Sequence, residues 1–145
     1  VRYIYLVSAD RETNQDYKNA IEMAALDAQK WYKKQMNGYT FHLNNPVVEV
    51  IKSQHNGDFF YKNSVNGQHK DNWGYYNAFA EVKRLLASEF NDEKYIWVIY
   101  SDGPGNKGRG GNGVAVMPEN DLLGLIGKNL ENSNINRWIG GGAQS

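Results

Sequence analysis

The sequence contains no cysteine and few prolines, and its basic and acidic residues balance at sixteen each. The absence of cysteine excludes disulfide bonds and thiolate zinc sites. A net charge of zero removes the bulk electrostatic basis for binding nucleic acid, so no nucleic-acid partner is expected. No apolar run approaches the roughly 20 residues that a membrane helix needs, so no membrane partner is expected either.

The apolar residues that are present alternate between strand-like and helix-like spacing along the chain. Strands are predicted at residues 2–7, 39–43, 47–51, 95–100 and 114–118, and helices at about 16–37, 72–90 and 120–130. This alternation favours an α/β fold in which helices pack on a mostly parallel sheet. With 145 residues, 41% of them hydrophobic, the chain fits one folded domain, which we expect to be part of a longer protein.

Residues 95–118 place a strand, a glycine-rich loop and a second strand in succession. The run YIWVIYSD is continuously apolar up to its last two residues, which is typical of a strand covered on both faces. The loop GPGNKGRGGNG allows the backbone to turn sharply or to approach a ligand. Pro118 then ends the run VAVMP, and a proline there suits a strand at the edge of a sheet. We therefore expect a binding site in this stretch.

The same loop contains G-x-G-x-x-G at residues 103–108, the pattern of dinucleotide-binding proteins. In those proteins the glycines open a helix that faces the pyrophosphate, whereas further glycines and a strand follow here. Nucleotide binding is therefore the weakest interpretation. Asp102, Asn106 and Asn112 fit a calcium loop poorly, because Pro104 and Gly113 occupy two of the ligand positions.

No catalytic residue and no metal ligand is assigned within the chain. Three histidines occur, and none has a metal-ligand spacing: His42, His55 and His69. Glu49 lies in a predicted strand without a second carboxylate for acid–base work. Among the tryptophans, Trp31 and Trp97 fall on apolar faces and are expected in the core, and Trp73 is a candidate ligand contact.

Six phrases of the sequence together resemble the N-terminal part of secreted, zincin-like zinc metalloproteases. They are YIYLVSADRE, the helix D-Y-x-x-A-I-E-M-A, PVVEV, YIWVIYSD, GVAVMPENDL and RWIGGGAQS. The resemblance covers nearly the whole chain and implies an extracellular protein whose twisted, mostly parallel sheet has an antiparallel edge strand. In this family a helix with His-Glu-x-x-His follows such a segment and binds zinc. Because that helix would begin after Ser145, zinc and catalysis are expected only with residues beyond the printed chain.

The resemblance also implies a partner, a peptide or protein substrate that pairs in extended conformation with the edge strand above the active site. The positions that match this substrate-binding strand are Asn112, Gly113, Val114, Ala115, Val116 and Met117. The alternative is a non-catalytic α/β binding or assembly module that uses the same exposed edge. Self-association is then expected through the edge, or through a sheet face near residues 95–100 that the zinc-binding helix would otherwise cover.

Overall fold

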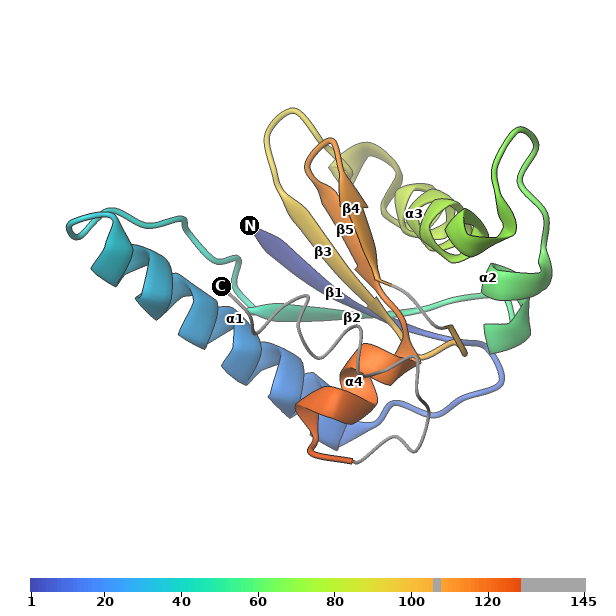
Figure 1. The fold of residues 1–145 in the computed structure, drawn as a ribbon, viewed down its shortest axis with the longest axis horizontal. Coiled ribbons are helices and arrows are strands. Elements are labelled where there is room, and N and C mark those ends of the chain that lie inside the picture. The colour runs from blue at the N-terminus through green and yellow to red at the C-terminus, as the bar shows by residue number, and fades with distance from the viewer. Residues whose placement is uncertain (106–107, 129–145) are drawn as a thin grey trace.

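The computed structural model describes residues 1–105 and 108–128, which form a five-stranded sheet with helices on both faces (Figure 1). The strands lie in the order β2-β1-β3-β5-β4. Their bounds are β1 Arg2–Val7, β2 Val48–Lys52, β3 Trp97–Ser101, β4 Arg109–Gly111 and β5 Val114–Met117. All neighbours pair in parallel except β4, which runs antiparallel to β5. The predicted fold class, a mostly parallel α/β sheet with an antiparallel edge strand, is confirmed.

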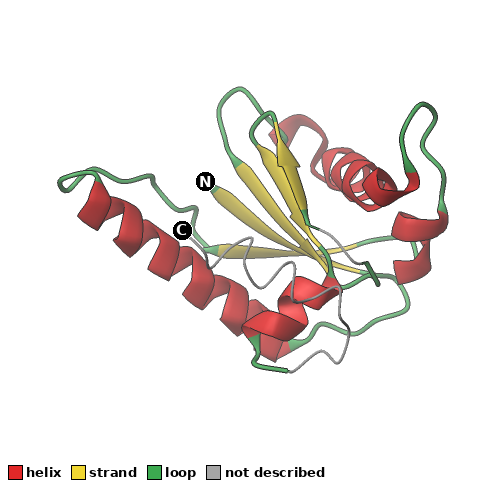
Figure 2. Cartoon of the chain, in the orientation of Figure 1, coloured by secondary structure: helices red, strands yellow, loops and turns green. Residues whose placement is uncertain are grey.

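The helices form two layers, one against each face of the sheet (Figure 2). The helices α1, Gln15–Gln35, and α4, Glu119–Leu125, lie on one face. The helices α2, Gly57–Lys62, and α3, Trp73–Leu86, lie on the other. Two single 3-10 turns, η1 Lys70–Asn72 and η2 Ala87–Glu89, flank α3. The segment 53–72, predicted to be one long loop, therefore contains a helix and a turn.

Strand alternation divides the core into two apolar clusters. In β1, Tyr3, Tyr5 and Val7 pack beneath α1 and α4, whereas Ile4 and Leu6 pack beneath α2 and α3. All six residues of β1 are buried because the strand is covered on both faces and paired on both sides. The strand predicted at 95–100 corresponds to β3, which is also buried on both faces: Tyr100 packs in one cluster, and Trp97 and Ile99 pack in the other.

Helix α1 begins and ends where its sequence predicts. The side chain of Asn14 accepts hydrogen bonds from the backbone N–H groups of Asp16 and Tyr17, which caps the first turn. Ile21 and Ala25 recur at helical spacing and are fully buried. The helix ends at Gln35, shortly before Gly38, whose φ of +96° lies in the left-handed region that favours glycine.

Two predictions near the end of α1 are wrong. Residues 30–40 are all exposed, since the helix runs past the part of the sheet that it covers. Trp31, predicted to lie in the core, is therefore 48% exposed. Residues 39–43 alternate like a strand but form none. This segment is hydrogen-bonded to α1 and to the N-terminus: Gln29 Nε2 donates to Phe41 O at 2.8 Å, Thr40 Oγ1 donates to Gln29 O at 3.0 Å, and Val1 N donates to His42 O at 2.6 Å.

A buried carboxylate attaches α3 to the end of β2. Glu81 is 3% exposed, and its Oε1 accepts hydrogen bonds from Ser53 Oγ at 2.8 Å and from Gln54 N at 3.2 Å. Arg84 donates to both carboxylate oxygens at 2.9 Å. Burial opposes ionisation of Glu81, but these donors outweigh it and lower the pKa to about 2.

We expect this carboxylate to make stability depend on pH between about 4.5 and 2. The pKa of Glu81 is lower in the folded chain than its ordinary value of 4.5, so its contribution is complete above pH 4.5 and is lost as pH falls through 2. Glu81→Gln should lower the free energy of unfolding at pH 7 by about 1–3 kcal/mol. The urea concentration at the midpoint of unfolding should then fall less between pH 4.5 and pH 2 than it does in the wild type. The exposed Glu93→Gln is the matched control, and an equal acid limb in both variants would contradict the assignment.

Candidate peptide-binding edge

A tight hairpin places β4 along the outer side of β5. Asn112 and Gly113 connect the strands, with φ values of +49° and +78°. Two successive left-handed residues are the geometry of a type I′ turn, which Asn-Gly favours and which matches the twist of paired strands. The register follows from this turn, with Gly111 opposite Val114 and Arg109 opposite Val116.

The strand β5 is not the edge of the sheet, so the prediction that the run VAVMP is an exposed edge strand is wrong. Its residues pair with β3 on one side and with β4 on the other. Val114 and Val116 are 3% and 2% exposed and pack against the α3 side of the core. Of the other predicted contact residues, Ala115 and Met117 are half-buried, and Asn112 and Gly113 are exposed in the turn. Strand addition at β5 would require β4 to leave.

The edge strand is β4, which the sequence interpretation took as part of the glycine loop. Two of its three residues are glycine, and glycine is depleted in strands, so the propensity signal is absent. The signal that could have found it is the Asn-Gly pair, because this dipeptide ahead of an apolar strand predicts a hairpin. All three residues of β4 are exposed.

The hairpin geometry determines which backbone groups of β4 are free to bind a ligand. In a two-residue hairpin the residues that flank the turn, here Gly111 and Val114, form a hydrogen-bonded pair. Hydrogen-bonded pairs alternate along an antiparallel ladder, so Arg109 also directs its N–H and C=O groups toward β5. Gly110, between them, directs its N–H and C=O groups away from the sheet. This residue presents one donor and one acceptor to an incoming strand.

Contacts with the start of α3 hold the hairpin in place. The Tyr75 hydroxyl donates a hydrogen bond to Gly111 O at 3.2 Å, and the Arg109 guanidinium donates to Asn72 Oδ1. Burial raises the pKa of the Tyr75 hydroxyl, which therefore stays a neutral donor. Because α3 packs on the sheet, these bonds position the edge relative to the rest of the fold.

The glycine loop ahead of β4 is anchored by Asp102, at the carboxyl end of β3. Asp102 is 1% exposed. Its Oδ1 accepts hydrogen bonds from Ser8 N at 2.8 Å and Ser8 Oγ at 2.6 Å, and its Oδ2 accepts one from the Tyr5 hydroxyl at 3.4 Å. Burial and the neighbouring Asp102 carboxylate both raise the pKa of Tyr5. Asp102 thus links β3 to the end of β1, and both of its oxygens accept hydrogen bonds from protein donors.

The aromatic ring of Tyr61 packs between two glycines that allow its close approach. A Cβ atom added to Gly74 of α3 would lie 2.1 Å from a ring carbon of Tyr61, and one added to Gly105 would lie 2.2 Å from the same carbon. The described residues on either side of 106–107 form no helix, which agrees with the argument against a dinucleotide fingerprint. Gly105 therefore serves to pack the loop on Tyr61.

His55, His69 and Glu49 each contact other groups of the protein. His55 stacks on Phe59 with ring centroids 3.7 Å apart, and His69 Nδ1 accepts a hydrogen bond from Asp71 N at 3.3 Å. Glu49 forms a bidentate ion pair with Arg2. Within residues 1–105 and 108–128, no group of three His, Cys, Asp or Glu side chains could hold a metal ion, so this part of the chain does not fit zinc. Trp73, the candidate contact, donates its indole N–H to Gln68 O at 3.2 Å.

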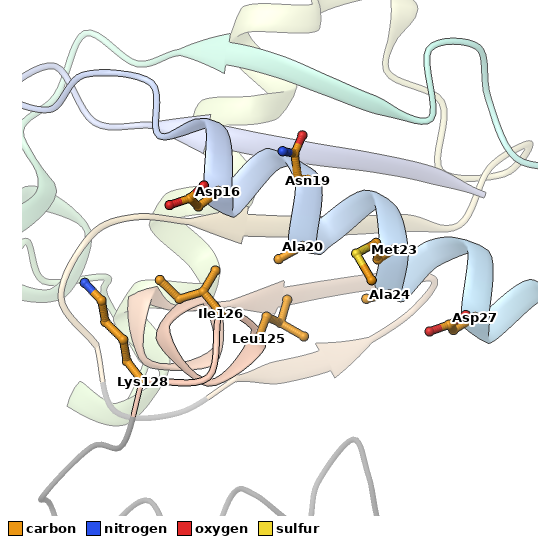
Figure 3. A pocket seen from close by; sticks show the side chains of 9 residues that line it. All are labelled: Asp16, Asn19, Ala20, Met23, Ala24, Asp27, Leu125, Ile126 and Lys128. Atoms are coloured by element: carbon orange, nitrogen blue, oxygen red, sulfur yellow. The ribbon is translucent and has the colours of Figure 1, made fainter.

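A groove of about 630 Å³ lies between α1 and α4, and no residue of β4 lines it (Figure 3). Its lining is Asp16, Asn19, Ala20, Met23, Ala24, Asp27, Leu125, Ile126 and Lys128. Asp16 and Asp27 are eleven residues apart, which separates them by about 16 Å along a helix. They therefore cannot act as a carboxylate pair, and the groove presents an apolar floor with isolated charges.

The chain was compared with protein-family models, with curated proteins and with solved structures, and no match was found. No helix among the described residues is long and apolar enough to cross a membrane. The family resemblance therefore stays a hypothesis based on the sequence phrases.

Proposed function

We propose that this chain is the substrate-aligning subdomain of a zincin-like, secreted zinc metallopeptidase, and that β4 is the strand along which an extended peptide binds. The observation that carries the proposal is the antiparallel edge strand β4, which is exposed and lies within the glycine-rich stretch. An antiparallel edge strand is what the resemblance implies at the rim of the active site. We therefore assign the peptide-binding strand to Arg109–Gly111 instead of Val114–Met117.

The role of the described residues in this proposal is binding. Gly110 offers its N–H and C=O groups to the main chain of a peptide, and strand addition through such groups does not depend on the peptide sequence. No chemical step is assigned to these residues, because they do not fit zinc. In the alternative, the same edge serves a non-catalytic module that binds a peptide or a second copy of the chain. Gly110 supports this alternative equally, since strand addition alone needs no reactive group.

The natural polypeptide that contains these residues should cleave extended peptides, and a zinc chelator should abolish the cleavage. Gly110→Pro should lower kcat/KM at least tenfold, because proline removes the outward N–H group while the bonds of Arg109 and Gly111 to β5 remain. The measurement is hydrolysis of a quenched fluorescent peptide. Gly110→Ala is the control, since its added Cβ would meet no atom closer than 3.6 Å, and it should change kcat/KM less than threefold.

The outcomes separate the two functions. Peptide binding without cleavage, still lost in Gly110→Pro, would favour the non-catalytic module. Equal behaviour of Gly110→Pro and Gly110→Ala would show that β4 is not the binding strand, and both functions would then be wrong.

A further inference from the structure

The edge strand carries a single side chain that a bound peptide can meet. Of its three residues, two are glycines, so Arg109 is the one place where β4 itself can distinguish between peptide side chains. A Cβ atom added to Gly111 would have no neighbour within 4 Å, which leaves the position beside the turn open.

The register places Arg109 on the α3 side of the sheet. Arg109 lies opposite Val116, which belongs to the apolar cluster beneath α3, whereas Gly110 lies opposite Ala115 on the other face. Side chains of directly opposed residues in paired strands lie on the same face, with Cβ atoms about 4.5–5.5 Å apart. A peptide residue opposite Arg109 therefore points to the α3 side, within reach of the guanidinium.

The charge of Arg109 is available to such a residue. Its hydrogen bond goes to the neutral amide oxygen of Asn72, and no ion pair between described residues involves it. The carboxylate of Asp71, which precedes Asn72, lies 3.8 Å from His69 Nδ1. A guanidinium presents five donors in a planar fork that matches a carboxylate, and the bond to Asn72 uses one of them.

We propose that Arg109 makes the edge strand selective for extended peptides with an acidic side chain at the position opposite it. This inference rests on the proposed function, because it requires the peptide to pair with β4. Backbone pairing at Gly110 then supplies binding that is independent of sequence, and Arg109 supplies the preference.

The test measures binding of three peptides that differ at one position. Tetramethylrhodamine-labelled heptapeptides Ser-Val-Thr-X-Thr-Val-Ser, with X as Glu, Gln or Lys, are titrated with the protein and followed by fluorescence anisotropy at low salt. The Glu peptide should bind about two- to fivefold more tightly than the Gln peptide, the range of an exposed ion pair, and the Lys peptide more weakly than both. Arg109→Gln should bring the Glu and Gln peptides to equal affinity.

A matched variant controls for net charge. Lys30→Gln removes the same charge from α1, where the Lys30 side chain is 79% exposed, and should preserve the preference for Glu. A preference for Glu that persists in Arg109→Gln, or that is absent from the wild type, overturns the proposal.

A second set of probes separates this failure from failure of the proposed function. Copies of each peptide that are methylated on successive backbone nitrogens cannot form the strand hydrogen bonds, and the protein itself is unchanged. They therefore test strand pairing even if Gly110→Pro does not fold. If methylation and Gly110→Pro weaken all three peptides at least tenfold but Glu and Gln peptides bind equally, the edge function stands and the acidic preference is wrong. If no peptide binds, or if binding is insensitive to both changes, both are wrong.

Discussion

Asp102→Ala is expected to lower the free energy of unfolding by about 3 kcal/mol, because it leaves buried donors without acceptors. Ser8 N, Ser8 Oγ and the Tyr5 hydroxyl all donate to this carboxylate inside the protein. A buried donor without an acceptor costs about 1–3 kcal/mol. Because Ser8 is fully buried, water does not reach its two donor groups to replace the carboxylate. The substitution therefore removes the side-chain link between the end of β1 and the end of β3, while their backbone pairing remains.

Urea denaturation followed by tryptophan fluorescence measures this effect. Asp102→Asn keeps the shape and one acceptor oxygen, so about half of the loss is expected. Asp92→Ala, on an exposed loop residue, is the control and should stay within about 0.5 kcal/mol of the wild type. If Asp102→Ala behaves like Asp92→Ala, the carboxylate does not hold the two strands together.

Gly74→Ala is expected to destabilise the fold by about 2–3 kcal/mol, although alanine is the better helix former. The gain in helix propensity is about 1 kcal/mol. Against it, the new methyl group would lie 2.1 Å from a ring carbon of Tyr61, so the ring or the helix must move. Because Tyr61 also contacts Gly105, its displacement should disturb the loop that leads into β4.

A double-mutant cycle identifies the cause of this loss. In a Tyr61→Ala background the methyl group meets no ring, so Gly74→Ala should become neutral or stabilising by up to about 1 kcal/mol. Gly124→Ala in α4 is the matched control, since a Cβ atom there would have no neighbour within 4 Å. An equal cost for Gly74→Ala with and without Tyr61 would exclude the ring as its origin.

The elements that sequence reasoning placed well are those whose signals are local. The helix α1 carries its cap at Asn14 and its apolar spacing within its own residues, and β1 and β3 are apolar runs that predict burial on both faces. The exposed end of α1 shows the limit of such local signals. Trp31 continues the apolar face of the helix, yet it is exposed because the helix extends beyond the sheet.

The edge strand and its anchor depend on contacts that the sequence does not display. The residues Arg109–Gly111 become a strand because a hairpin sets them beside β5, and two glycines have no strand propensity of their own. The role of Asp102 depends on Ser8 and Tyr5, which are 94 and 97 residues away. Spacing along the chain predicted an edge strand after residues 95–100, and pairing across the sheet decided that this strand is β4 instead of β5.

The short length of β4 also affects how the folded chain behaves at high concentration. Amyloid-like stacking requires segments of about six or seven residues with high β-propensity. On this side of the sheet a neighbouring molecule finds three residues, two of them glycine and the third a fixed positive charge that repels its own copy. The edge strand β4 is therefore a poor template for the addition of further copies of the chain.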